Sequence, residues 1–259
     1  MYMKKIVLVL LLISISIFFL SGCSTEKNLD SNITIAAAVS LKNVFDEKLI
    51  PEFEKENPNI TIEATYDSSG KLQQQIKEGA PVDVFVSAAT KQMDELNEEG
   101  YILKDSIRDL LENKIVVIVP RDSDYLISDF EDLLKVEKIA IGDPSSVPAG
   151  QYAKELLTNL NLWDKAQGKL SLGTNASEVL NWVKEKSADC GIVYSTDAYS
   201  TDEVKIVLEA DENMVSKVVY PVGIVKSTQN VESANKFVEF LRSDKAHEIF
   251  SEYGFTPIK

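Results

Sequence analysis

The sequence predicts an α/β protein with two lobes, each a mostly parallel sheet flanked by helices. Short apolar runs alternate with longer segments whose apolar residues recur at helical spacing, which is typical of βα units. No internal repeat, low-complexity tract or long linker interrupts the chain after residue 31. The apolar runs are too many for one sheet at this length, so we expect two sheets. The chain is expected to cross between them near Lys114 and to return near Pro221.

The individual elements follow from these patterns. In the helix predicted for residues 41–55, Leu41, Val44, Phe45, Leu49 and Phe53 share one face. Further helices are expected at residues 72–78, 91–99, 151–159, 178–186, 231–242 and 246–250. Strands are expected at residues 33–37, 60–65, 82–86, 115–119, 138–141, 191–194, 204–208 and 218–225.

The N-terminus has the layout of an export signal. Lys4 and Lys5 precede a run from Ile6 to Leu20 that is apolar except for two serines and is shorter than the ~20 residues of a membrane-spanning helix. Leu20-Ser21-Gly22-Cys23 resembles the lipobox of bacterial lipoproteins, which implies that Cys23 is lipidated. We therefore expect export and lipid anchoring at the outer face of the cell membrane.

Four units are expected along the chain, and their bounds follow from the export signal and the crossing points. Residues 1–22 form a signal peptide, residues 23–31 a lipidated tether, residues 32–113 plus 225–259 lobe 1, and residues 114–224 lobe 2.

The chain is strongly acidic. Its 41 Asp and Glu residues against 27 Lys and Arg residues give a formal charge of −14, and removal of residues 1–22 would make it about −16. This balance argues against nucleic acid as a partner, because phosphate contacts need clustered basic residues. With Cys23 lipidated, Cys190 is the only other cysteine, and its apolar surroundings predict a buried thiol.

Four strand-to-helix junctions are rich in small and polar residues. First-turn N–H groups without partners and the helix dipole make such junctions suitable for binding anions. Each one alone is also explained as a helix cap. The junctions are Ala38-Val39-Ser40-Leu41, Asp67-Ser68-Ser69-Gly70-Lys71, Pro144-Ser145-Ser146-Val147-Pro148-Ala149-Gly150 and Thr174-Asn175-Ala176-Ser177-Glu178.

Catalytic and metal motifs are weak in comparison. Ser69-Gly70-Lys71 lacks the first glycine and the final hydroxyl of a phosphate loop, and no GxSxG motif is present. His247 is the only histidine, and we expect it on the surface. A hydrolase using Ser68 or Ser69 would therefore lack an evident base, and a zinc or iron site would lack its usual imidazoles. These observations favour binding without catalysis and without a cofactor or a direct metal-cation site.

Several segments carry a resemblance to a known family, the bacterial molybdate-binding proteins of ABC importers. The first half contributes Ala36-Ala37-Ala38, Ser40-Leu41, Ser68-Ser69, Leu72, Gln75-Ile76 and residues 79–85. The second half contributes residues 142–144 and 147–150, Tyr152-Ala153, residues 191–194 and residues 253–255. The resemblance covers essentially the whole chain after the signal.

The resemblance implies a type II periplasmic-binding-protein architecture with a ligand cleft between two lobes. It implies that Ser40 and Ser69 bind an oxyanion through hydroxyl and backbone N–H groups, Ala149 and Ala176 through backbone N–H groups, and Tyr194 through its phenol. The ligand would be molybdate or tungstate, with no preference between them predicted. The partners would be the permease and ATPase subunits of an importer, and the protein would be a monomer.

The sequence departs from the family pattern at Val39, Asp67 and Gly70. A carboxylate at residue 67 facing the cleft would repel a dianion. This keeps sulfate or phosphate as the alternative ligand.

Overall fold

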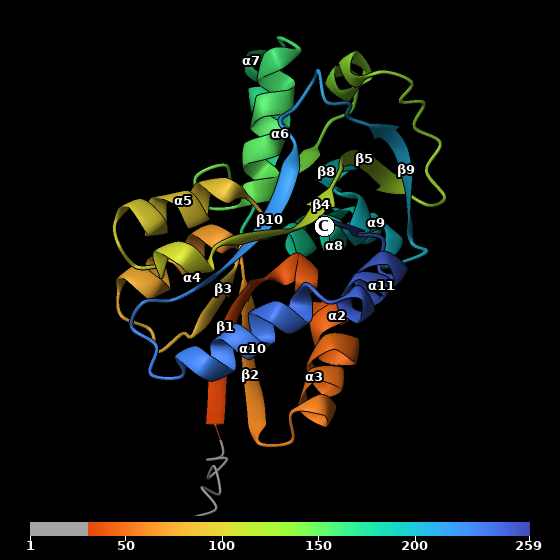
Figure 1. Ribbon diagram of the computed structural model, residues 1–259. Helices are drawn as coiled ribbons and strands as arrows, with labels where there is room; N and C mark the ends of the chain where they lie inside the picture. The colour runs from red at the N-terminus through yellow and green to blue at the C-terminus, as the bar shows by residue number, and fades with distance from the viewer. Residues whose placement is uncertain (1–30) are drawn as a thin grey trace, which may run out of the picture. The chain divides into compact units, whose positions relative to one another are not determined.

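The strands of the protein form two sheets in the computed structural model, which describes residues 31–259 (Figure 1). The first sheet has the order β11-β4-β10-β3-β1-β2. Its strands are β1 (Ser31–Ala38), β2 (Ile60–Asp67), β3 (Val84–Val86), β4 (Arg108–Asn113), β10 (Val218–Ile224) and β11 (Thr256–Pro257). The predicted signal peptide and the predicted lipidation site, Cys23, lie outside the described residues.

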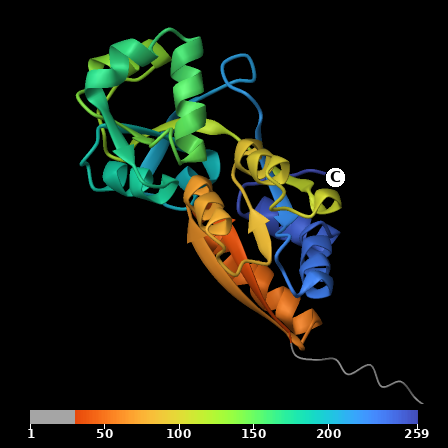
Figure 2. The ribbon, with the colours of Figure 1, turned by 90° about the vertical axis from the view of Figure 1, so that its left-hand side faces the viewer.

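The second sheet has five strands in the order β7-β6-β8-β5-β9. These are β5 (Ile115–Pro120), β6 (Ile139–Gly142), β7 (Leu170–Gly173), β8 (Cys190–Tyr194) and β9 (Val204–Glu209). Figure 2 separates the green and teal segments that carry most of this sheet from the orange and dark-blue segments of the first.

Both sheets are mixed rather than mostly parallel. In the first, β1 pairs in parallel with β2 and β3, and in the second β6 pairs in parallel with β7 and β8. The other pairings are antiparallel, and they involve the strands β4, β5, β9 and β10, through which the chain passes between the sheets. Each sheet thus has a parallel half built from βα units and an antiparallel half built from crossing strands.

The first crossing lies at Lys114, between β4 and β5, as the sequence predicts. The return occurs earlier than predicted, because β10 already pairs with β3 and β4 of the first sheet from Val218 onward. The predicted lobe 2, residues 114–224, had included this strand. A β-branched run predicts a strand but does not determine which sheet the strand joins.

Helices follow most of the parallel strands. The α-helices are α2 (Lys42–Val44), α3 (Ile50–Glu56), α4 (Ser69–Lys77), α5 (Thr90–Glu98), α6 (Pro148–Asn159), α7 (Trp163–Ala166), α8 (Ala176–Lys184), α9 (Ser195–Tyr199), α10 (Val231–Leu241) and α11 (Asp244–Glu252). Short 3-10 turns are η1 (Val39–Leu41), η3 (Lys104–Ser106), η4 (Phe130–Lys135) and η5 (Gln167–Lys169). None of the helices in residues 31–259 has the length and apolar character to cross a membrane.

The helix predicted for residues 41–55 is irregular. It passes from η1 through α2 to a π-helical turn, η2 (Phe45–Leu49), and then into α3. Pro51 lies in the first turn of α3. Because proline has no N–H to donate and its ring crowds the carbonyl one turn earlier, a wider turn before it relieves the conflict.

Aromatic side chains fill the core beside the first sheet. Phe237 on α10 makes edge-to-face contacts with Phe45 and Phe53, at ring-centroid distances of 6.2 and 5.1 Å. Phe250 on α11 packs against Phe45 as well. These contacts join the C-terminal helices to the first helical segment.

Two glycines shape the loop that leads from β6 into α6. A Cβ atom built on Gly150 would lie 1.9 Å from the carbonyl oxygen of Gly142, and one on Gly142 would lie 2.4 Å from Val147 Cγ1. Such distances are closer than any side chain tolerates, so the turn between β6 and α6 requires glycine at both positions. Pro148 begins the helix, where its missing N–H costs nothing.

We predict that Gly150→Ala destabilises the protein by about 1–3 kcal/mol, because the added methyl group forces the loop away from β6. Thermal melting followed by circular dichroism measures the change, and the expected drop is several degrees. Gly168→Ala is the matched control, since nothing lies within 4 Å of its added Cβ. If the two variants had the same melting temperature, the close approach of Gly150 to Gly142 would not be required.

Candidate functional site

The carboxyl ends of the parallel strands carry the residues singled out in the sequence. Ser40 follows β1 and Ser69 follows β2, while Ala149 follows β6, Ala176 follows β7 and Tyr194 ends β8. The ends are level within each sheet, since Ala38 pairs with Asp67 and Gly142 pairs with Gly173. Parallel strands therefore bring helix N-termini to one edge of each sheet, where ligands of α/β proteins commonly bind.

Ser69 and Tyr194, from different sheets, meet at the backbone of Ala88. The Ala88 N–H donates to Ser69 Oγ at 3.0 Å, and the Tyr194 phenol donates to the Ala88 carbonyl at 3.1 Å. Both side chains are almost fully buried. The Ser69 hydroxyl keeps its own proton for another acceptor. The Tyr194 phenol has one proton and donates it to the Ala88 carbonyl. The hydroxyl group must therefore rotate before it can donate to a ligand.

Ser40 is linked to Tyr194 through a third side chain, Tyr220 on β10. Ser40 Oγ and the Tyr220 hydroxyl are 3.1 Å apart, and the rings of Tyr220 and Tyr194 have centroids 5.6 Å apart. Burial raises the pKa of both phenols well above the usual range, so both stay protonated.

Ala149 is brought towards Ser69 by a contact between the sheets. The N–H of Gly70, in the first turn of α4, donates to the carbonyl of Ser146 at 3.0 Å. Ser146 lies just before α6, in whose first turn Ala149 is buried. A side chain on Gly70 would collide with Ser146, because its Cβ would lie 2.4 Å from that carbonyl oxygen. The departure from the family pattern at residue 70 therefore permits this close approach.

Ala176 is the first residue of α8, whose cap is Asn175. The Asn175 side chain accepts a hydrogen bond from the N–H of Glu178 at 2.9 Å, and the N–H of Ala176 has no intrahelical acceptor at its position. Helix α8 contacts η1, which carries Ser40. Ser69, Tyr194 and Ser40 are thus linked through Ala88 and Tyr220, whereas Ala149 and Ala176 are brought near them by contacts of the segments that carry them.

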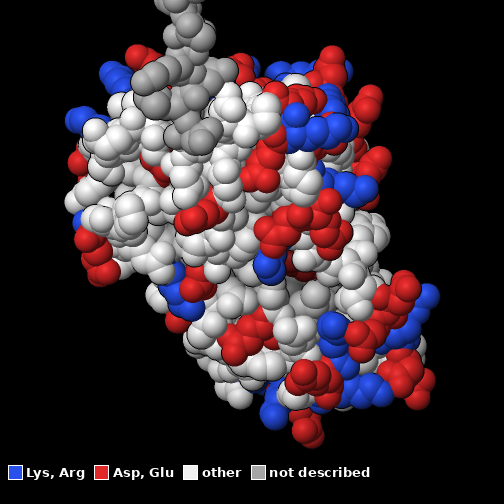
Figure 3. Space-filling view, turned by 90° about the horizontal axis from the view of Figure 1, so that it is seen from below, with Lys and Arg blue, Asp and Glu red and all other residues white. Residues whose placement is uncertain are grey.

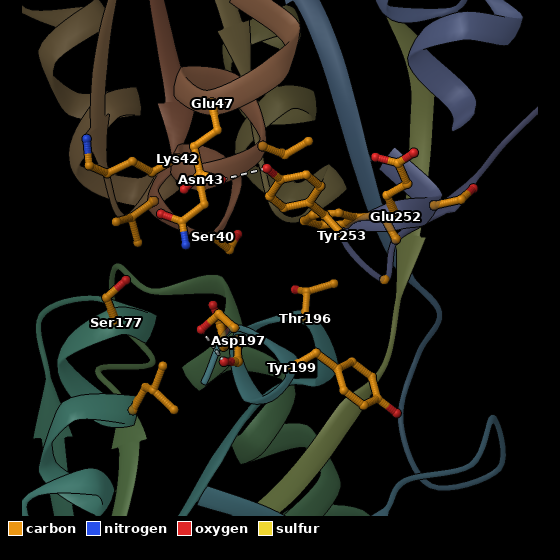
Figure 4. A pocket seen from close by; sticks show the side chains of 17 residues that line it. Ser40, Lys42, Asn43, Glu47, Ser177, Thr196, Asp197, Tyr199, Glu252 and Tyr253 are labelled. Carbon is orange, nitrogen blue, oxygen red and sulfur yellow. Dashed lines mark hydrogen bonds between the residues drawn. The ribbon is translucent and has the colours of Figure 1, made fainter. Parts of the chain in front are cut away.

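A cavity of about 610 Å³ opens beside Ser40. Figure 4 shows Ser40 on one side of it and Ser177, Thr196 and Asp197 on the other. The remaining predicted residues, Ser69, Ala149, Ala176 and Tyr194, are outside its lining. Of the five predicted residues, Ser40 is the one that lines this cavity.

The negative charge of Asp67 is balanced by groups beside it. Its carboxylate accepts the N–H of Ser68 at 2.7 Å and lies 3.2 Å from the ammonium group of Lys71. Elsewhere, charged side chains of both signs lie close together on the right of the face shown in Figure 3, whereas much of its left part is uncharged.

Asp197 lies at the cavity with its carboxyl group buried. Desolvation raises the pKa of Asp197 from 3.8 to about 7, although the N–H of Tyr194, 3.3 Å from Oδ2, opposes the rise. This carboxyl therefore titrates near neutral pH, unlike an exposed aspartate.

Cys190 is buried, as predicted, and burial raises the pKa of its thiol to about 12. His247 on α11 is half-buried rather than fully exposed, and it lines a different cavity from Ser40. In the part of the chain that the structure describes, no group of three or more His, Cys, Asp or Glu side chains could hold a metal ion.

Three residues with direct roles in this arrangement were not singled out from the sequence. Ala88, Ser146 and Tyr220 connect the predicted residues to one another. Two of these links are made by backbone atoms, which carry no signal in the sequence. Tyr220 lies in an apolar strand, where a buried tyrosine is ordinarily a packing residue.

Comparisons with known proteins place the chain in a family. The model of the family described as bacterial extracellular solute-binding protein matches residues 33–256. A putative ABC transporter substrate-binding lipoprotein of Bacillus subtilis, YvgL, is 43% identical over 91% of this chain and 92% of that protein. The molybdate-binding protein ModA of Haemophilus influenzae is 38% identical over 87% of this chain and 90% of that protein.

A solved structure supports the same relationship. The substrate-binding domain of a putative molybdenum ABC transporter from Clostridium difficile is 43% identical, with a TM-score of 0.69, over 88% of this chain and all of that chain. These similarities confirm the resemblance drawn from the sequence and the predicted two-lobed α/β fold class, with the sheets mixed as described.

We predict that Asp197→Asn stabilises the protein above neutral pH and has little effect near pH 4. The unfolded carboxyl ionises near pH 4, whereas the buried one resists ionisation up to about pH 7, so the wild type loses stability across this interval. Each unit of pKa shift is worth about 1.4 kcal/mol, which gives an upper bound of about 4 kcal/mol at pH 8.

Melting temperatures of both proteins at pH 4, 6 and 8 measure this effect. The difference between variant and wild type should grow with pH. Asp164→Asn on the exposed surface is the control, with no growing difference expected. A constant difference for Asp197→Asn would contradict the elevated pKa.

Proposed function

The chain belongs to the family of bacterial extracellular solute-binding proteins, and from this premise we propose that it captures molybdate or tungstate and delivers it to an ABC importer. The five predicted donors lie at strand ends of the two sheets, and the contacts at Ala88 bring two of these ends together; this arrangement is the observation that supports an oxyanion as the solute. Two relatives in the comparison carry molybdate or molybdenum in their names, which supports this anion in particular.

The proposed site uses neutral donors only. They are the hydroxyl and N–H groups of Ser40 and Ser69, the N–H groups of Ala149 and Ala176, and the Tyr194 phenol. Hydrogen bonds to a charged group are worth ~1.5–3 kcal/mol each, so about seven would exceed 10 kcal/mol in total. Nanomolar affinity requires about 12 kcal/mol after the costs of closure and ordering. No lysine or arginine is needed in the site.

The arrangement around Asp67 supports a dianion as the ligand. Its carboxylate is already bound to the Ser68 N–H and paired with Lys71, so it offers little repulsion to an anion beside Ser69. This removes the main reason for preferring sulfate or phosphate over molybdate. A site made only of donors also disfavours phosphate, which is partly protonated near neutral pH and brings a proton that needs an acceptor.

We assign binding without catalysis. The Ser69 hydroxyl accepts a hydrogen bond from a backbone N–H, which does not activate a nucleophile, and His247 lies on α11 beside another cavity. We also propose that the protein is exported and lipidated at Cys23. It would work as a monomer with the permease and ATPase subunits of the importer. The name of the Bacillus subtilis relative, a putative substrate-binding lipoprotein, supports the anchor.

We predict that molybdate and tungstate raise the melting temperature of the protein beginning at Ser24, whereas sulfate and phosphate at equal concentration do not. A ligand at one hundred times its dissociation constant adds about 2.7 kcal/mol of stability, which is several degrees here. Differential scanning fluorimetry with each sodium salt measures the shift. If only sulfate or phosphate raised the melting temperature, the proposed ligand would be wrong.

Matched variants locate the binding in the same experiment. Ser40→Ala and Ser69→Ala should each weaken molybdate binding by about tenfold or more, since each loses a hydrogen bond to a charged group. His247→Ala should leave the affinity unchanged. Equal losses in all three would place the ligand elsewhere.

We also predict that the association rate of molybdate rises with ionic strength. The protein has a formal charge of −14, and Glu47 and Glu252 line the cavity beside Ser40, so an approaching dianion is repelled until salt screens the repulsion. Stopped-flow tryptophan fluorescence between 10 and 200 mM sodium chloride should show an increase of roughly severalfold. Glu252→Gln should reduce the slope, and a rate that falls with salt would contradict the electrostatic account.

A further inference from the structure

A buried polar cluster lies where the chain first crosses between the sheets. Asn113 is the last residue of β4, and the chain enters β5 two residues later. Asn113 is 8% exposed and Tyr220 is fully buried. The side chain of Asn113 makes hydrogen bonds to Tyr220 of the first sheet and to Thr196 of α9, which follows β8 of the second sheet, and it reaches Ser40 through Tyr220.

The orientation of the Asn113 amide is fixed by its neighbours. The backbone N–H of Lys114 lies 2.8 Å from Asn113 Oδ1 and can only donate, and the Ser195 hydroxyl donates to the same oxygen at 2.9 Å. A reversed amide would place an NH₂ group against a backbone N–H. The Nδ2 end therefore faces Tyr220 at 3.2 Å and Thr196 Oγ1 at 2.9 Å.

This orientation determines the direction of the hydrogen bond from Asn113 to Tyr220 and leaves the phenol proton free for the next bond. Since the Tyr220 oxygen accepts from Asn113, the one proton of the phenol is available for Ser40 Oγ, 3.1 Å away. Burial keeps the pKa of Tyr220 well above its usual value, so this proton is present. When the phenol donates to Ser40 Oγ, the serine oxygen accepts, and its own proton is left for the cavity on which it opens (Figure 4).

We propose that Asn113 and Tyr220 are positioning residues that hold the Ser40 hydroxyl as a donor towards the cleft, so that this part of the site selects fully deprotonated oxyanions over protonated ones. The inference rests on the proposed function, because Ser40 matters only if it meets the anion. Without Tyr220 the Ser40 hydroxyl rotates freely and can also offer a lone pair to a protonated anion.

Ser69 provides an internal comparison. Its oxygen also accepts a hydrogen bond, but from the backbone N–H of Ala88, which no substitution at residue 88 other than proline removes. The direction of the Ser69 hydroxyl is therefore built into the backbone. The direction of the Ser40 hydroxyl depends on two side chains and can be changed by mutation.

Tyr220→Phe tests the inference, with dissociation constants measured by isothermal titration calorimetry for molybdate and for hydrogen arsenate, which carries a proton at pH 7. The affinity for molybdate should fall about tenfold, and the affinity for hydrogen arsenate should fall much less or rise. The ratio of the two affinities therefore falls. In a Ser40→Ala background, Tyr220→Phe should change that ratio by less than about twofold, because the hydroxyl it orients is gone.

Asn113→Asp is the second variant, and it tests the inference even if Tyr220→Phe does not fold. A carboxylate can only accept, so Tyr220 must donate to it, and the Ser40 hydroxyl then donates to Tyr220 and turns a lone pair to the cleft. Molybdate affinity should fall further than in Tyr220→Phe, while circular dichroism confirms that the fold is retained.

The outcomes separate the two proposals. A wild type that binds neither molybdate nor tungstate overturns the proposed function and this inference with it. A wild type that binds molybdate, combined with a Tyr220→Phe loss that is equal for both anions and undiminished in the Ser40→Ala background, overturns the inference alone and leaves Tyr220 a packing residue.

Discussion

The unpaired N–H groups in the first turn of a helix need an acceptor, and parallel strands bring several such turns to one edge of a sheet. In this protein the rule operates twice, at the carboxyl ends of β1, β2 and β3 and at those of β6, β7 and β8. The antiparallel strands have a different task, since they carry the chain between the sheets. Every contact of the candidate site depends on this division, because it makes the two donor-bearing edges face each other.

Neutral donors resolve an apparent conflict between the charge of the protein and that of its proposed ligand. A chain with a formal charge of −14 repels anions at long range, so the site has to select them at short range. Backbone N–H groups and hydroxyls act only at hydrogen-bond distance and add no positive charge. Pairing of Asp67 with Lys71, and the raised pKa of Asp197, keep nearby carboxylates from opposing them.

Selection of the anion depends on the direction in which each hydroxyl donates, as well as on the positions of the donors. A hydroxyl group can donate or accept, so a serine becomes a selective donor only when its oxygen is already occupied by another proton. The backbone does this for Ser69 through Ala88, and the cluster of Asn113 and Tyr220 does it for Ser40. Because Asn113 also binds Ser195 and Thr196, the same cluster ties the first strand crossing to the second sheet.

The sequence by itself determined the α/β class, the positions of the main strands and helices, and the strand-to-helix junctions that carry Ser40, Ser69, Ala149 and Ala176, because periodicity, glycine and proline act locally. It missed β4, β7 and β11, which are short or charged, and it did not show that β10 joins the first sheet. The link between Ser40 and Tyr220, 180 residues apart, and the neutralisation of Asp67 were decided only by the tertiary structure. Strand pairing and side-chain direction depend on contacts between distant segments, and no local pattern records them.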